Sequence, residues 1–448
     1  MSTSPDPVQA PRLRRVLKLR DLVLYGVIVI QPVAPMSVFG VLQERGQGHV
    51  VSALLIAMVA MLFTGLSYGN MAAVYPAGGS AFTYVARGIH PGLGWVTGWS
   101  MLMDFVFNPL ICTCWCAQQA NQFVPAVPVW AWNIVFASGF TALNLRAIQS
   151  SARVNARLAA AMGAVVAVVL VAGVLYLRRQ PDLSAAYFLR PFYDPATFQA
   201  GALLHCTSLA VLTYIGFDAI STLSDEAENP RRDIRLATVL TCLCIGLLAA
   251  VEVYLAQLVW PASRPFPNVD TAYVSVAAEI WPPLLTIVGL TLLLANVGSG
   301  SGAQLGAARL LYAMGRSGAL PRRFFGTVDA RWRIPRNNVL LVGGIVLVGS
   351  FFLSFSLGVE LLNFGALIAF MGVNAAAFLH FLVRAKQRSW SKGLPALAGF
   401  FICFALWLNL SRSAMLYGTL WMLLGLGYGA WRTAWFRRPF SFAEPERA

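Results

Sequence analysis

Long apolar runs, separated by short polar segments, extend along the chain from residue 21 to residue 434. A membrane-spanning helix needs about 20 consecutive apolar residues, and most of these runs reach that length. We therefore predict twelve spanning helices, near residues 21–43, 49–70, 92–120, 128–145, 154–177, 200–224, 234–259, 282–314, 338–356, 359–382, 394–411 and 414–434. The polar, proline-containing stretch 261–281 is predicted to be an outer loop with a short helix.

The composition excludes a soluble protein. Of the 448 residues, 58% are hydrophobic and 11% are charged, whereas soluble domains carry roughly 25% charged residues. A soluble fold of this size could not hide so much apolar surface, so lipid must solvate the side chains. We predict an all-α integral membrane protein whose surroundings are the lipid bilayer.

The net charge of +15 sets the orientation rather than indicating nucleic acid, because no basic helix with interleaved aromatic residues is present. With the N-terminus inside, about 27 Lys and Arg residues fall on the cytoplasmic side and about 6 outside. Both termini are therefore predicted to be cytoplasmic. The basic N-terminus is read as a cytoplasmic tail, because its apolar run is long and lacks a small-residue cleavage site.

Residues typical of a metal site or an active site do not converge in the sequence. Cys112, Cys114 and Cys116 alternate within an apolar run, and helical residues two apart point about 200° away from each other. The four histidines do not pair at ligand spacing. The run 298–302 fits G-x-S-x-G but lacks the strand–turn–helix context of a hydrolase. We therefore expect no metal site, no cofactor and no enzymatic activity.

The first apolar run is interrupted by Gln31-Pro32-Val33-Ala34-Pro35. Each proline removes a backbone donor and clashes with the preceding turn. In lipid, the freed carbonyl groups are tolerated only beside a cavity or other protein. We therefore take Gln31, Pro32 and Val33 as candidate substrate-binding residues, with a simple proline kink as the alternative.

The sixth run carries a second interruption, Thr213-Tyr214-Ile215-Gly216-Phe217-Asp218, with a glycine and a carboxylate at mid-membrane depth. Interrupted helices at matching places in two halves of a chain indicate an inverted-repeat transporter. The substrate is then expected between the two breaks, near the bilayer centre.

Several motifs resemble the amino acid–polyamine–organocation superfamily, and most closely its bacterial putrescine-importer branch. The matching segments are 75–84, 89–91, 98–100 with Asp104, 214–240 and 311–316. The resemblance covers most of residues 18–340 and is weaker afterwards. It implies a LeuT-type five-plus-five inverted repeat followed by two helices, in the inner membrane of a bacterium. The expected divisions are a tail 1–20, a first repeat 21–177, an outer loop 178–199, a second repeat 200–382, two helices in 383–434 and a tail 435–448.

Two departures from the superfamily bear on the substrate. Amino-acid carriers often have a Gly-Ser-Gly break whose amides hold a carboxylate, and this chain has Gln31 and two prolines instead. That difference favours a polyamine. However, Phe105 stands where we expect the importer branch to have tyrosine, so an amino acid remains the alternative substrate. A membrane-embedded sensor is a third reading, although the short tail after Trp435 offers little for signalling.

Two carboxylates and nearby aromatic rings could bind a diamine. A charge at the bilayer centre costs about 2.5–3.5 kcal/mol even on the mildest scale, so we expect Asp104 and Asp218 each to have a function or a stabilising partner. A diamine needs carboxylates or carbonyls at its ends and aromatic faces along its stem. The candidate aromatic residues are Tyr214, Phe217, Phe105, Phe107 and Trp99. Alternatively, the two aspartates bond to each other's helices or cap the broken helix. Glu252 and Glu360 are expected at the membrane interface.

A charged run, residues 225–233, follows the sixth helix. Local ion pairs are expected there, and Glu226, Arg231 and Arg232 could latch a cytoplasmic gate. The alternative is a solvated loop, because exposed pairs contribute only about 0–1 kcal/mol.

Coupling to an ion stays open in the sequence. Some proton-coupled members carry a lysine midway along helix 5, where this chain has Met162. Ser299 and Ser301 are candidate sodium ligands, although small residues there are also typical of close helix packing. The resemblance and the carboxylates favour a proton as the coupling ion. The oligomeric state cannot be inferred.

Overall fold

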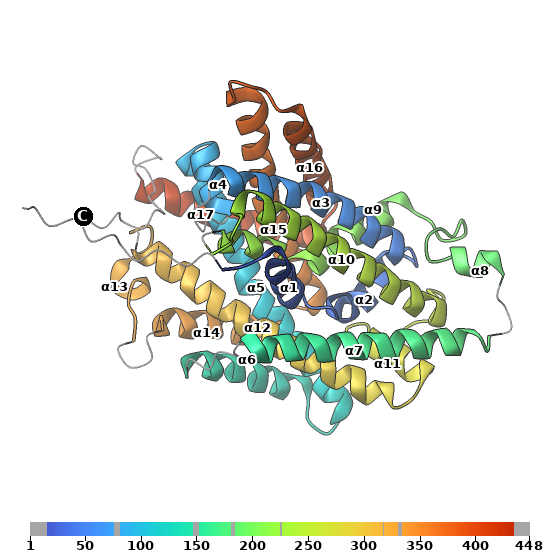
Figure 1. Ribbon diagram of the computed structural model, residues 1–448. Coiled ribbons are helices and arrows are strands. Elements are labelled where there is room, and N and C mark those ends of the chain that lie inside the picture. Colours follow the sequence, from blue (N-terminus) through green and yellow to red (C-terminus); the bar gives the residue numbers. More distant parts are fainter. Residues whose placement is uncertain are drawn as a thin grey trace, which may run out of the picture.

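Figure 1 shows the computed structural model as one bundle of long helices, with the short helix α8 at one end and α13 at the other. The structure describes residues 16–75, 81–146, 152–180, 184–224, 226–316, 318–329 and 334–433. Within these ranges the chain is helical and contains no strand apart from one isolated bridge pair. An all-α protein is confirmed.

Each of the twelve apolar stretches contains helix. The elements are α1 (Leu19–Ile30), α2 (Ala34–Arg45), α3 (Val50–Val74), α4 (Ala81–Gly88), α5 (Pro91–Phe123), α6 (Val129–Leu145), α7 (Ala152–Leu177), α8 (Ala185–Leu189), α9 (Ala200–Ala210), η1 (Val211–Tyr214), η2 (Phe217–Leu223), α10 (Pro230–Val259), α11 (Ala272–Ile280), α12 (Leu284–Arg316), α13 (Arg322–Phe325), α14 (Arg336–Phe352), α15 (Phe355–Phe378), the π-helical turn η3 (Leu379–Arg384), α16 (Trp390–Leu408) and α17 (Arg412–Arg432).

Eight helical spans in the described part of the chain are long and apolar enough to cross a membrane. A ninth span forms if α1 and α2, which bend by 48° at their junction, count as one broken helix. The apolar helices α6 and α14 are shorter than these spans. The protein is therefore a multi-pass membrane protein.

The long helix α5 organises the bundle by packing against α6, α12 and α15. A Cβ atom added to Gly365 of α15 would lie 2.5 Å from the carbonyl oxygen of Ser100 of α5, so these two helices touch through their backbones. Against α17, the indole nitrogen of Trp95 donates to the carbonyl oxygen of Gly425 at 2.9 Å. Interhelical contacts of this kind fix α5, and with it the position of Asp104.

Two features differ from the sequence prediction. The turn between α14 and α15 lies at Ser354 rather than near residue 358, because the Ser354 hydroxyl caps α15 by accepting from the amide of Leu357 at 3.2 Å. Glu252 and Glu360, which were expected at the membrane interface, are covered by other helices: their exposed fractions are 0% and 3%. The apolar pattern places a residue along a helix axis, but not around it.

Candidate functional site

The break in the first span lies between α1 and α2, at Gln31. This residue has φ 71°, outside the helical range, and Pro32 can offer no amide donor to continue the helix. The side-chain amide of Gln31 donates to the carbonyl oxygen of Ala295 in α12 at 3.1 Å. Pro32 and Val33 are buried, whereas Gln31 is partly exposed. The prolines thus interrupt the helix, and α12 holds the interruption in place.

The break in the sixth span lies between η1 and η2, at Ile215 and Gly216. Gly216 has φ 121°, a conformation that residues with a Cβ atom rarely adopt. A Cβ atom at this position would lie 3.0 Å from Val29 and 3.2 Å from Ile30, the last residues of α1. The two breaks, distant in the sequence, therefore lie against each other.

Asp218 and Asp104 bring two carboxyl groups to this junction. Backbone N–H groups around the break, including those of Gly216 and Ala219, face the Asp218 carboxyl group and interact with it electrostatically. It also interacts electrostatically with Asp104 of α5. Both side chains are partly exposed. The ion pairs formed within the described residues include neither aspartate. The junction therefore holds two acidic groups without a basic partner from that part of the chain.

Tyr68 of α3 is a neighbour that the sequence did not reveal. Its charge interactions include both Asp218 and Asp104. The residue is buried, its hydroxyl has no hydrogen-bond partner, and its ring packs edge-on against Phe217 at 5.6 Å between centroids. A tyrosine within an otherwise apolar run gives no sign of the direction it faces.

The predicted aromatic residues contact protein. The Tyr214 hydroxyl donates to the carbonyl oxygen of Leu54 in α3 at 2.8 Å, and the residue is fully buried. Phe217 is also fully buried, in the cluster with Tyr68. Phe105 is partly exposed, and its ring faces Gly306 of α12. Neither Tyr214 nor Phe217 presents its ring to an open space in this conformation.

The two serine candidates, Ser299 and Ser301 of α12, bond to different helices. Ser299 donates from its hydroxyl to Oδ1 of Asn108 in α5 at 3.3 Å. Ser301 instead accepts, through its backbone carbonyl, from the side chain of Asn144 in α6 at 3.0 Å. Asn108 was not identified as a candidate from the sequence, although it lies four residues after Asp104 and therefore shares its helix face. That spacing was the available signal.

The cytoplasmic-gate candidates meet the segment before α1 through backbone atoms. The amides of Val16 and Leu17 both donate to the carbonyl oxygen of Glu226, at 2.9 and 3.0 Å, and Leu17 accepts in turn from the amide of Glu228 at 2.9 Å. Arg231 and Arg232 are exposed. The ion pairs formed by described residues include none of Glu226, Arg231 and Arg232; Asp225 lies outside the described residues. A short parallel bridge between Leu17 and Ala227, rather than an ion pair, joins this loop to the segment before α1.

The three alternating cysteines diverge, as their helical spacing requires. The thiol groups of Cys112, Cys114 and Cys116 donate to Asn108 Oδ1 and to the carbonyl oxygens of Leu353 and Leu293 respectively. No group of three or more His, Cys, Asp or Glu residues in the described ranges could hold a metal ion.

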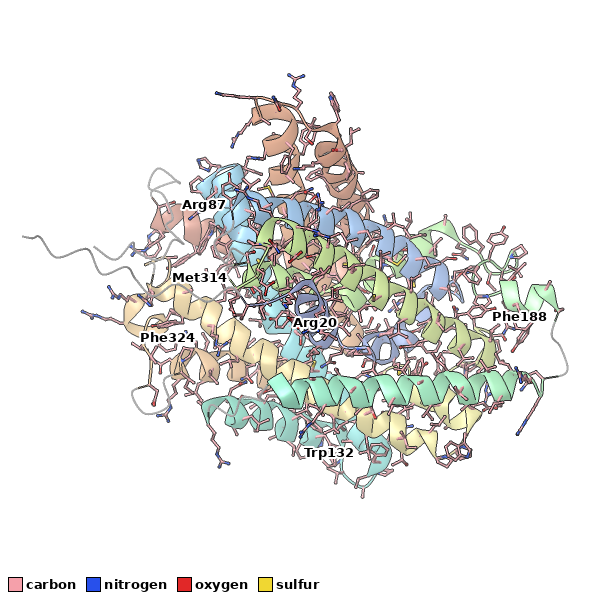
Figure 2. The ribbon with its side chains drawn as sticks, viewed as in Figure 1. Arg20, Arg87, Trp132, Phe188, Met314 and Phe324 are labelled. Atoms are coloured by element: carbon pink, nitrogen blue, oxygen red, sulfur yellow. The ribbon has the colours of Figure 1, made fainter. Side chains whose placement is uncertain are left out.

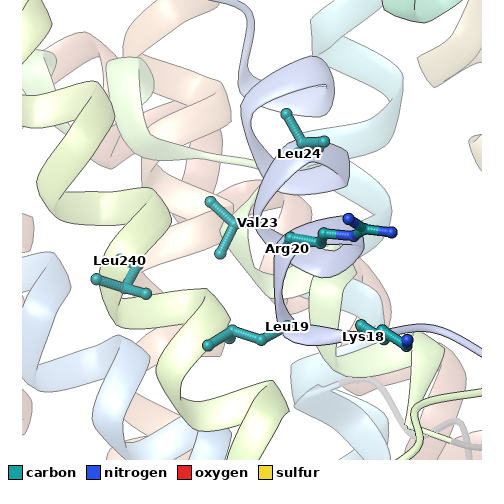
Figure 3. Close-up of a pocket in the computed structure, with 6 residues that line it drawn as sticks. All are labelled: Lys18, Leu19, Arg20, Val23, Leu24 and Leu240. Atoms are coloured by element: carbon teal, nitrogen blue, oxygen red, sulfur yellow. The ribbon is translucent and has the colours of Figure 1, made fainter.

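A surface depression of about 690 Å³ lies on the outer side of α1 and α10, lined by Lys18, Leu19, Arg20, Val23, Leu24 and Leu240 (Figure 3). None of the residues at the two breaks lines it. Its floor is apolar, as expected of a face that meets lipid tails. We therefore place the candidate site at the breaks and not in this depression.

Comparison with known proteins decides the family. Residues 34–435 match the model of the amino acid permease family. The chain belongs to the amino acid permease family. This permease is 34% identical, over 95% of both chains, to the low-affinity putrescine importer PlaP of Escherichia coli K12. It is 27% identical to the branched-chain amino acid permease BcaP of Lactococcus lactis, covering 92% of this chain and 93% of that one.

A more distant relative is the vacuolar cationic amino acid transporter 4 of Arabidopsis thaliana, 25% identical over 81% of this chain and 62% of the relative. The resemblance drawn from the motifs is therefore confirmed, although residues 76–80 of the first motif lie outside the described residues. The permease is a membrane transporter of small molecules and not an enzyme, since its family and relatives are transporters.

Proposed function

We propose that this permease is a secondary active transporter that imports a small cationic polyamine, similar to putrescine, together with protons. The observation that carries the proposal is the pair Asp104 and Asp218, which interact at the junction of the two breaks without a basic partner among the described residues. The identity to a putrescine importer supports the same substrate class.

The junction has the chemistry that a diamine requires. Ammonium groups donate several hydrogen bonds and are stabilised by carboxylates and by carbonyl oxygens. At the first break, Pro32 and Pro35 lack amide donors, so the break is poorly suited to bind a substrate carboxylate. Asp104 and the carbonyl groups freed around Gln31 are the proposed partners of one ammonium group, and Asp218 the partner of the other.

Alternating access would use the breaks as hinges. We propose twelve spanning helices in two inverted repeats of five, with two further helices and both termini in the cytoplasm of a bacterial cell. Figure 2 places Arg87, Met314 and Phe324 toward one end of the bundle and Phe188 at the other. The first end also carries Arg322 and Arg323 of α13, which supports its assignment as the cytoplasmic end.

An amino acid is the second candidate substrate. The identity to a branched-chain amino acid permease supports it, and so does the likeness to a cationic amino acid transporter. A cationic amino acid would still find Asp104 and Asp218, but its carboxylate would need donors that the proline-rich break does not supply. For this reason the polyamine is preferred.

The experiment exchanges each aspartate for asparagine in protein reconstituted into liposomes. Asp218→Asn keeps an oxygen that can accept from the break amides, and Asp104→Asn keeps the volume of the side chain. Each loses one charge-assisted hydrogen bond of about 1.5–3 kcal/mol, so kcat/KM for putrescine should fall about 10- to 150-fold. Glu44→Gln, which removes a carboxylate from an exposed position, is the matched control and should leave kcat/KM for putrescine unchanged. Unchanged putrescine transport in both variants would remove the pair from the mechanism.

A further inference from the structure

Glu252 of α10 is a carboxyl group that the proposed binding site does not use. Its side chain is 0% exposed. Both of its carboxyl oxygens are shielded from solvent and lack a hydrogen-bond partner. A buried polar group without a partner is costly, and in a membrane helix it usually has a function.

The surroundings of Glu252 contain no balancing charge. Its titratable neighbour is Tyr273 of α11, which interacts with it electrostatically and whose hydroxyl donates to the backbone carbonyl oxygen of Glu252 at 3.4 Å. The charged residues on the elements packed against α10 are Arg20 and Asp21 on α1, Glu44 and Arg45 on α2, Arg153 and Arg157 on α7, Asp218 on η2, and Glu279 on α11, which pairs with Arg264; Asp270 precedes α11. The helix α3 carries no charged residue. No ion pair among the described residues includes Glu252.

We propose that Glu252 binds the coupling proton of the transport cycle, which rests on the proposed function as a proton-coupled importer. The site is enclosed, and a metal cation would need several oxygen ligands that it does not offer. A proton needs no space. In the step, one carboxylate oxygen forms an O–H bond with a proton taken from water. That bond breaks on release, and the proton returns to water.

The contact with Tyr273 couples this proton to a moving part. The Tyr273 ring packs edge-on against Phe39 of α2 at 5.6 Å between centroids, and α2 is the second half of the broken first helix. A charged Glu252 needs water, whereas a neutral one is compatible with enclosure by α2 and α11. Proton binding therefore favours the closed arrangement seen here, and release requires α2 and α11 to move apart.

Infrared spectroscopy of the purified protein tests the protonation directly, without any substrate. At neutral pH the wild type should show a carbonyl band of a protonated carboxyl group, which Glu252→Gln removes. Glu279→Gln, whose group is partly exposed and paired with Arg264, should leave the band unchanged. Should the Gln variant not fold, Glu252→Asp keeps an ionisable group and should shift the band. A spectrum without any band assignable to Glu252 would overturn the inference.

Transport in liposomes tests the coupling. Wild-type uptake of labelled putrescine should rise at least tenfold under an inward proton gradient, whereas Glu252→Gln should show no gradient effect and keep putrescine counterflow within about twofold. Gradient-driven accumulation at the wild-type level by Glu252→Gln would overturn the role of Glu252. A wild type that carries no putrescine would instead overturn the proposed substrate, while the infrared band would still report on Glu252.

Discussion

Gly216 offers a direct test of how the two breaks fit together. Its backbone has φ 121° and ψ −18°, a conformation that residues with a side chain adopt only under strain. The substitution Gly216→Ala introduces that strain and places a Cβ atom 3.0 Å from Val29 and 3.2 Å from Ile30 of α1. Because Ile30 ends α1 beside the first break, these neighbours have little freedom to withdraw.

The expected cost follows from these two effects. A residue held in a sparsely populated backbone region costs about 1–3 kcal/mol. The tight contact with α1 adds to this, so we expect about 2–3 kcal/mol in total. Each 1.4 kcal/mol is a factor of ten in an equilibrium constant. The ratio of molecules with both breaks formed to molecules in which a break is lost should therefore fall about 30- to 140-fold.

The assay compares thermal unfolding in detergent with putrescine uptake in liposomes. Gly344→Ala in α14 is the matched control, because no heavy atom lies within 4 Å of the added Cβ atom and alanine favours helix over glycine. We expect Gly216→Ala to unfold several degrees lower and to lose uptake, whereas Gly344→Ala keeps both. Equal stability and equal transport in the two variants would refute the proposed fit of the breaks.

Two further predictions concern the ends of the helices. Burial, and then the charge of Glu44, raises the pKa of Asp270 from 3.8 to about 6, so ionisation destabilises the fold as the pH rises through about 6. Asp270→Asn should therefore raise the free energy of unfolding at pH 8 by at most about 2–3 kcal/mol and change it little at pH 4, as measured by thermal unfolding at the two pH values; equal effects at both would contradict this. His205 accounts for two contacts, with the carbonyl oxygen of Asn409 at 2.7 Å and with Glu360 at 3.8 Å. We expect His205→Ala to lower the free energy of unfolding by about 1–3 kcal/mol, and addition of Glu360→Gln to recover part of that loss, in a double-mutant cycle measured by thermal unfolding. Strictly additive effects of the two substitutions would show that the pair is not coupled.

The sequence located the breaks because their causes are local. Proline has no amide donor wherever it stands, and the glycine of a Tyr-Ile-Gly-Phe-Asp segment can adopt a positive φ without help from neighbours. Gln31 and Gly216 do have positive φ angles. The apolar runs likewise located the helices, because a helix must satisfy its own backbone in lipid.

The directions of side chains around each helix were not predictable in the same way. Tyr68 joins the site only because α3 turns that face toward Asp104 and Asp218, which tertiary packing decides. The burial of Glu252 was not predictable for the same reason, since α2 and α11 cover a position that the apolar pattern puts near a helix end. The backbone bridge at Glu226 also depends on a contact between segments about 200 residues apart.

Polyamine import is tested most directly by uptake of labelled putrescine by the purified permease in liposomes, under an imposed inward proton gradient and with unlabelled amino acids as competitors. We predict uptake that requires the gradient and that excess leucine or lysine does not reduce. Accumulation of an amino acid by liposomes that take up no putrescine would contradict the polyamine assignment, and it would leave the proline-rich break without its proposed explanation.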